Sequence, residues 1–175
     1  MEYYKNYIRV DLPGNFLLGL RDPTGVSIFS CRTQVMQDNL TSEWWPYSFH
    51  YSSNWCTIGP NVLIAGGFLE GSANCDYVLA DYRNAIKVKS GNINEGRYWH
   101  GICYSSYHKK GYVVFGSNGV KSIEEYDLSE DCWTKMKQWS GSPSDTMAKA
   151  YKSALYITIY NHSFVLKFDP ETQAY

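Results

Sequence analysis

Short apolar runs recur at a nearly constant spacing along the chain. The four runs begin 46, 50 and 43 residues apart, and each follows a polar or small residue. A second β-like run, which ends in an aromatic residue, follows each of them after 13 to 20 residues. Gly, Asn, Ser and Pro separate the runs, and no stretch has a convincing helical period, so we expect three or four short strands per repeat. The four apolar runs are residues 16–18, 62–64, 112–114 and 155–157.

A repeat of about 45 residues with this strand content predicts an all-β fold whose small sheets pack radially, as the blades of a β-propeller do. One such unit cannot bury both of its faces alone, and stacked units cover one another. We expect a single domain over residues 1–175. Its approximate units are residues 14–60, 61–110, 111–153 and 154–175, with residues 1–13 available to complete the last one.

Several residues hold matching places in the repeats. Gly66 and Gly67 close one apolar run, and Gly116 closes the corresponding run of the next repeat. Because glycine has no Cβ, it suits a bend at which two backbones approach closely. The other motif residues are Arg97 and His100, then Tyr126 and Asp127, and then Trp133.

Together these residues resemble the kelch motif, which combines a double glycine, a Tyr before a turn, a following Trp and an Arg-x-x-His in the next blade. The resemblance is strongest over residues 61–133. The first repeat has Gly19-Leu20, and the last has Ile159-Tyr160, where the double glycine is expected. The resemblance implies a kelch-type β-propeller of four-stranded blades that binds a partner protein through the loops between its blades.

The number of repeats leaves two interpretations open. Kelch propellers usually have five to seven blades, whereas this chain offers about four repeats. Residues 7–13 read as a strand that can complete the last blade and close a small ring. Alternatively, the chain is part of a larger propeller, and its exposed blade faces then favour self-association.

Composition narrows the choice of partner and compartment. The net charge is −1, so there is no basic excess for binding a phosphate backbone, and we expect no nucleic-acid partner. The start of the chain lacks the pattern of a signal peptide, and the longest apolar stretch, residues 62–69, is too short to cross a bilayer. Five cysteines, an odd number, favour free thiols in a cytoplasmic protein.

Candidate catalytic groups are better explained as structural. His50 and His100 share a place in the repeat, which favours a histidine hydrogen-bonded within each blade rather than a base or a ligand. Asp127 and Asp169 recur after an aromatic residue, where Asp caps a turn. No zinc-ligand spacing and no Gly-x-Ser-x-Gly motif is present. We therefore expect a protein that is not an enzyme and that uses no cofactor or metal.

The candidate partner-binding residues lie in the variable segments. Trp44, Trp45 and Tyr47 are close together beside a proline, and adjacent strand residues cannot both point into one core face. Trp139 lies beside basic residues, and Arg97 offers a guanidinium, although a structural role suits Arg97 better. We expect a non-catalytic interaction module, used as an adaptor or a substrate-recruiting domain. The alternatives are a carbohydrate-binding or enzymatic propeller that uses its central channel, and an inactive fragment of a longer kelch protein.

Overall fold

The described part of the chain is built from β-strands alone. The computed structural model describes residues 16–21, 25–30, 35–37, 52–81, 86–117 and 119–175. Every regular element within these ranges is a strand, which confirms the all-β prediction. The same ranges include no helix of the length and apolarity that a bilayer crossing requires.

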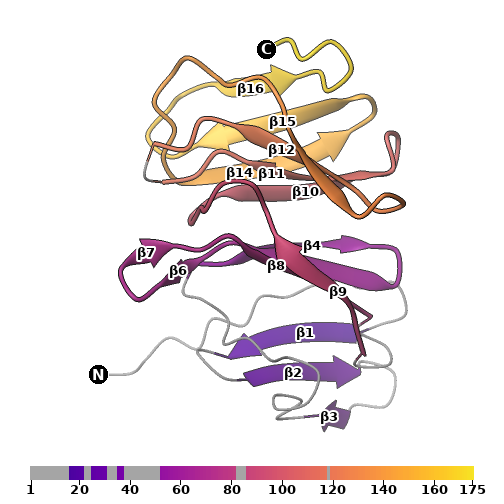
Figure 1. Cartoon of the computed structure of the whole chain (residues 1–175). Helices are drawn as coiled ribbons and strands as arrows, with labels where there is room; N and C mark the ends of the chain where they lie inside the picture. Colours follow the sequence, from indigo (N-terminus) through magenta and orange to yellow (C-terminus); the bar gives the residue numbers. More distant parts are fainter. Residues whose placement is uncertain (1–15, 22–24, 31–34, 38–51, 82–85, 118) are drawn as a thin grey trace.

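The strands form four antiparallel sheets, in chain order, and one small hairpin (Figure 1). Sheet I holds β1 (Phe16–Arg21), β2 (Gly25–Ser30) and β3 (Val35–Gln37). Sheet II holds β4 (Asn54–Ile58), β5 (Asn61–Ala65), β8 (Asp76–Asp81) and β9 (Ile86–Asn92), and β6 (Phe68–Leu69) pairs with β7 (Ser72–Ala73). Sheet III holds β10 (Gly101–Ser105), β11 (Lys110–Val114), β12 (Ile123–Asp127) and β13 (Cys132–Lys135). Sheet IV holds β14 (Thr146–Tyr151), β15 (Ala154–Ile159) and β16 (Val165–Phe168).

Each sheet is a meander, because its strands pair in the order in which the chain makes them. Figure 1 shows the four sheets stacked one upon the next from the N-terminal to the C-terminal side. The first strand of sheet III, β10, contacts both β4 and β14, which are the first strands of the two flanking sheets. The first strands of sheets II, III and IV therefore lie side by side.

Sheets II, III and IV begin one strand earlier than the repeats read from the sequence. Three of the expected units start at residues 61, 111 and 154. These positions lie at or next to the first residues of β5, β11 and β15, which are the second strands of their sheets. In sheets II and III the second strand is buried on both faces and makes a continuous apolar run, whereas the exposed and half-buried positions of β4 and β14 blur their pattern. In sheets II, III and IV the apolar runs thus mark an inner strand rather than an edge.

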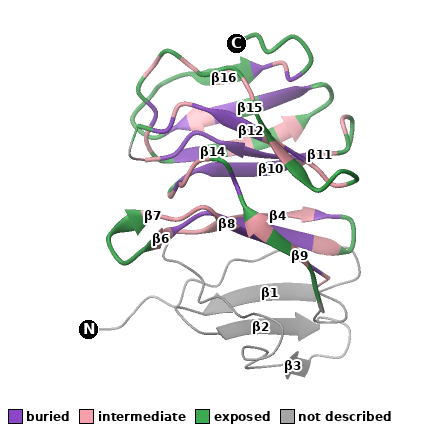
Figure 2. Cartoon of the chain, viewed as in Figure 1, coloured by how far each residue is buried: buried purple, intermediate pink, exposed green. Residues whose placement is uncertain are grey.

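The core lies between successive sheets. One cluster packs sheet II against sheet III through fully buried residues such as Leu63, Val113 and Tyr126. A second cluster packs sheet III against sheet IV through Tyr112 and Leu155, among others. Tyr112 and Val113 are neighbours on β11 and point to opposite faces, so this strand serves both clusters. Figure 2 shows the middle of the stack largely buried.

The glycines after the second strands make the close approach that the sequence predicts. By register, Ala65 of β5 corresponds to Val114 of β11, so Gly67 matches Gly116. Both have positive φ, 114° and 138°, and Phe115 at 52° takes the left-handed place of Gly66. A Cβ on Gly66 would collide with the Arg97 carbonyl oxygen and lie 2.8 Å from Cε1 of His100.

Gly66→Ala should lower the free energy of unfolding by about 3 kcal/mol, from left-handed strain plus a collision with the backbone. Gly59→Ala is the matched control, because Gly59 has a similar φ of 58° and open space around it. Strain alone should then cost about 1 kcal/mol at Gly59. Urea unfolding of both variants measures the difference. Equal losses would show that the contact between Gly66 and the Arg97 turn carries no energy.

Two aspartates cap matching turns, as the sequence predicts. Oδ1 of Asp127 accepts hydrogen bonds from the N–H groups of Ser129 (2.8 Å) and Glu130 (3.1 Å). Oδ1 of Asp169 accepts them from Glu171 (2.9 Å) and Thr172 (3.3 Å). The aromatic residues that follow also match. Trp133 stacks on Tyr126 with ring centroids 4.8 Å apart, and Tyr175 packs against Phe168 at the same centroid distance with its ring tilted by 46°.

Candidate functional site: a pocket at the start of three first strands

The turn at residues 97–100 joins three sheets through its backbone. Its four consecutive carbonyl oxygens each accept a hydrogen bond from a different segment. In order, the donors are the N–H groups of Gly67 (2.7 Å), Ser117 (2.9 Å) and Thr146 (2.9 Å), and Nδ2 of Asn54 (2.7 Å). These donors belong to sheets II, III and IV or to their connections, so the turn holds the first strands of the three sheets in register.

Arg97 anchors this turn from inside the protein. Its side chain is fully buried and forms an ion pair with the equally buried Glu124. Nη1 donates to the carbonyl oxygens of Phe115 and Ser122, both at 3.1 Å, and Nε donates to that of Glu95 at 3.2 Å. A guanidinium with these internal partners cannot reach another molecule. The structure therefore supports the structural role of Arg97 and corrects its inclusion among partner-binding residues.

His100 is buried in a different way from the one expected. Its side chain has no exposed surface, and neither Nδ1 nor Nε2 has a hydrogen-bond partner among the described residues. The predicted hydrogen-bonded histidine is therefore wrong, and the ring is instead held by packing against Gly66. Burial, helped by the nearby charge of Arg97, lowers the pKa of His100 to about 3. The imidazole is therefore neutral at physiological pH.

His50 lies outside the described residues, but the register of β4 contradicts the repeat position assigned to it. His100 directly precedes Gly101, the first residue of β10, whereas His50 lies four positions before Asn54, the first residue of β4. The residue that corresponds to His100 is Ser53. The hairpin between β10 and β11 is two residues longer than the one between β4 and β5, so equal sequence offsets do not mean equal places in the sheet.

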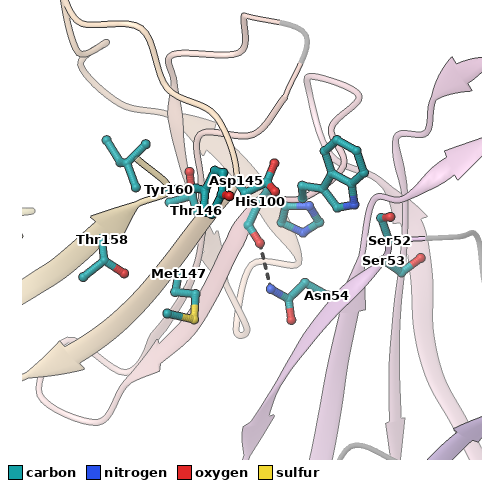
Figure 3. Close-up of a pocket in the computed structure, with 11 residues that line it drawn as sticks. Ser52, Ser53, Asn54, His100, Asp145, Thr146, Met147, Thr158 and Tyr160 are labelled. Atoms are coloured by element: carbon teal, nitrogen blue, oxygen red, sulfur yellow. Dashed lines mark hydrogen bonds between the residues drawn. The ribbon is translucent and has the colours of Figure 1, made fainter. Parts of the chain in front are cut away.

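A pocket of about 530 Å³ opens beside this turn (Figure 3). Register places most of its lining residues at corresponding positions in three sheets, directly before or at the start of each first strand, and the end of β15 in sheet IV completes the lining. Sheet II contributes Ser52, Ser53 and Asn54, the 97–100 turn contributes Trp99 and His100, and sheet IV contributes Asp145, Thr146, Met147, Thr158, Ile159 and Tyr160. The pocket thus exists only because the sheets stack in order.

Trp99 is the most unusual residue of the lining. Its φ of 50° lies in the left-handed region, where a bulky side chain is strained. The carbonyl oxygen of Trp99 is tied to the N–H of Thr146, and its ring meets that of Tyr98 edge-on at 5.2 Å. Nevertheless, 45% of Trp99 is exposed. Strain that keeps a large aromatic residue at the surface is typical of a functional position.

Of the residues proposed as partner anchors from the sequence, Trp44, Trp45 and Tyr47 lie outside the described residues. Trp139 is half-buried and stacks on Phe115, with ring centroids 5.5 Å apart and planes 21° apart. It packs as part of the cluster between sheets III and IV rather than standing free.

Trp99, Asp145 and Tyr160 are candidate binding residues that the sequence did not lead us to expect. One signal available in the sequence is the pair of positions at the start of each first strand, where Ser52 and Ser53, Trp99 and His100, and Asp145 and Thr146 correspond. These positions become visible only when β4, β10 and β14 are aligned by register. The apolar second strands, which define the repeat in the sequence, do not reveal them.

The pocket has the chemistry of a binding site. The part of the chain that the structure describes holds no group of three or more His, Cys, Asp or Glu side chains placed for a metal ion. The lining combines hydroxyl and amide groups with exposed aromatic rings and one carboxylate, that of Asp145. No protein-family model and no curated protein matches the sequence. The resemblance to kelch proteins thus depends on the motif residues alone.

Proposed function

We propose that the chain is a kelch-type β-propeller, or part of one, that acts as a non-catalytic protein-interaction module. Four sheets stacked in chain order, with first strands side by side in three of them, support this architecture. The paired turn caps at Asp127 and Asp169 and the buried Arg97 support the kelch assignment. Binding takes place at the pocket beside the 97–100 turn rather than at the loops singled out in the sequence.

One observation carries this proposal: three sheets place corresponding residues around a single pocket with a strained, exposed Trp at its rim. Trp is enriched at the energetic centre of protein interfaces, where a large rigid ring is buried on binding. Tyr160 and Met147, which are 65% and 72% exposed, extend the apolar surface around Trp99. An extended segment of a partner protein can therefore bury aromatic and thioether surface while its backbone bonds the polar lining.

Trp99→Ala should weaken the binding of partner peptides at least about tenfold, the usual effect of removing a central aromatic anchor. Peptides selected from a random phage-displayed library on the purified chain provide the ligands, and isothermal titration measures their affinities. Tyr107→Ala is the matched control, because Tyr107 is 62% exposed but lies in the hairpin at the other end of β10. Selected peptides that bind Trp99→Ala and the wild type equally would contradict the proposal.

A carbohydrate ligand is the second candidate, because the same pocket sets hydroxyl and amide groups beside an exposed indole ring. Sugars present polar edges and apolar faces, and this lining offers partners for both. Thermal unfolding in the presence of a panel of mono- and oligosaccharides separates the candidates. Stabilisation by a sugar that disappears in Trp99→Ala would favour carbohydrate binding over the binding of a protein segment.

A further inference from the structure

One described residue gives the pocket its charge. Among the described side chains that line it, Asp145 is the sole acidic one and none is Lys or Arg, while His100 is buried in its neutral form. Arg97, the nearest cation in the turn, is fully buried and bonded away from the pocket. The next basic residue along β14 is Lys149, which does not line the pocket. The pocket is therefore negative.

The carboxylate of Asp145 has most of its hydrogen-bonding capacity unused. Asp145 is exposed, and its one side-chain hydrogen bond, from Oγ of Ser117, is long at 3.4 Å. No Lys, Arg or His among the described residues forms an ion pair with it. Its backbone is nevertheless fixed, since the N–H of Tyr160 donates to its carbonyl oxygen at 2.7 Å. A carboxylate can accept several hydrogen bonds. The Asp145 carboxylate is therefore held in place by its backbone while most of its acceptor sites are open to a ligand.

The aromatic residues of the same pocket favour the same sign of charge. The rings of Trp99 and Tyr160 are exposed, and the face of an aromatic ring attracts cations. Met147 lies at the start of β14 beside Asp145 and offers apolar surface to an aliphatic stem. Anions are disfavoured by Asp145, and a divalent metal would need more than one carboxylate or imidazole ligand.

We propose that this pocket binds the basic side chain, Lys or Arg, of an extended segment of the partner protein. The Asp145 carboxylate pairs with the ammonium or guanidinium group, and Trp99 and Tyr160 pack against it and its stem. Long basic side chains suit such a site because they combine an apolar stem with a charged end. The inference rests on the proposed function, because it names the chemistry of the partner segment at the same pocket.

N-acetyl-lysine methylamide tests the inference directly, with N-acetyl-norleucine methylamide as a probe of nearly the same stem without the charge. Binding is followed by NMR through the indole N–H signal of Trp99, which is assigned as the one missing from Trp99→Phe. We expect the lysine probe to bind about fivefold more tightly than the norleucine probe, from a cation–π contact plus an exposed ion pair. Equal affinities would overturn the inference.

Variants of Asp145 provide the second test. Asp145→Asn should remove the ion-pair share of the preference for the lysine probe and leave the share of the aromatic rings, and Asp145→Glu should retain most of the preference. Glu130→Gln is the matched control, since it removes an exposed carboxylate from the Asp127 turn, away from the pocket. An equal effect of Asp145→Asn and Glu130→Gln would reduce the result to overall charge and overturn the inference. Melting temperatures of the variants show that each one is folded.

The two proposals fail in different ways. One outcome is that selected peptides depend on Trp99 while the lysine probe binds no better than the norleucine probe. In that case the inference of a basic side chain is wrong, and the proposal that the pocket binds a partner protein is unaffected. If the lysine probe binds as expected but no selected peptide depends on Trp99, the pocket accepts a cation and the proposed role in binding a partner protein is wrong.

Discussion

Arg97→Met should lower the free energy of unfolding by about 4 kcal/mol, because it leaves the buried carboxylate of Glu124 without its counter-ion. Both side chains of this pair are fully buried. Glu124 keeps only the hydrogen bonds that Asn94 donates to Oε2, from its N–H at 2.7 Å and its Nδ2 at 2.8 Å. The carbonyl oxygen of Phe115 also loses its Arg97 donor, and that of Ser122 keeps the N–H of Phe115 at 3.0 Å. Urea unfolding monitored by Trp fluorescence measures the loss.

Two further variants show whether burial causes the effect. Lys110→Met removes a cation that pairs with Asp127 and Glu125, but the Lys110 side chain is 26% exposed. Breaking such a pair should cost about 1 kcal/mol or less. Arg97→Met combined with Glu124→Leu should recover part of the loss, because the second change removes the unpaired charge. A loss at Arg97 no larger than that at Lys110 would show that the pair does not hold the 97–100 turn.

Features that depend on a few consecutive residues could be predicted from the sequence. The apolar second strands are buried on both faces, so their signal survives without any knowledge of the neighbouring sheets. The turn caps at Asp127 and Asp169 need only the residue two positions on. Gly67 and Gly116 were recognisable because a positive φ favours the same residue type at both places.

Features that depend on how the sheets stack could not be predicted in the same way. Trp99, Asp145 and Asn54 are far apart in sequence and meet only because β10 contacts both β4 and β14. The mistaken match of His50 with His100 has a related cause. Hairpins of different length shift the sequence offsets, while the hydrogen-bonded register of the strands is unaffected. The expectation that His100 is hydrogen-bonded failed because its surroundings come from Gly66 and Arg97 rather than from its own strand.

The 97–100 turn links the core to the pocket. Arg97 and His100 point into the protein and are fully buried, while Trp99, between them, is exposed at the pocket rim. The carbonyl oxygens of the same four residues hold the surrounding segments. Variants that loosen the buried side of the turn should therefore also disturb the pocket. Arg97→Met, where it stays folded, should bind the selected peptides more weakly than Lys110→Met does.

Acidification should destabilise the protein through His100. The pKa of this imidazole is lowered to about 3 in the folded chain by burial and by Arg97, against an ordinary value near 6.5 when it is exposed on unfolding. Below pH 6.5 the unfolded chain thus takes up a proton that the folded chain refuses. The free energy of unfolding should fall by about 1.4 kcal/mol for each pH unit between 6.5 and 3 on this account. Above pH 6.5 His100 contributes no pH dependence.

His100→Leu isolates this contribution, since it keeps a buried side chain of similar bulk and removes the titrating group. Between pH 7.5 and 4.5 the wild type should lose about 3 kcal/mol more than His100→Leu does. His162→Gln is the control, because His162 is exposed, and it should follow the wild type. Urea unfolding at the two pH values measures each loss. Equal losses in the wild type and His100→Leu would mean that the imidazole is protonated in the folded chain, with a partner for its nitrogens. The packing of the turn around Gly66 would then need to open to admit that partner.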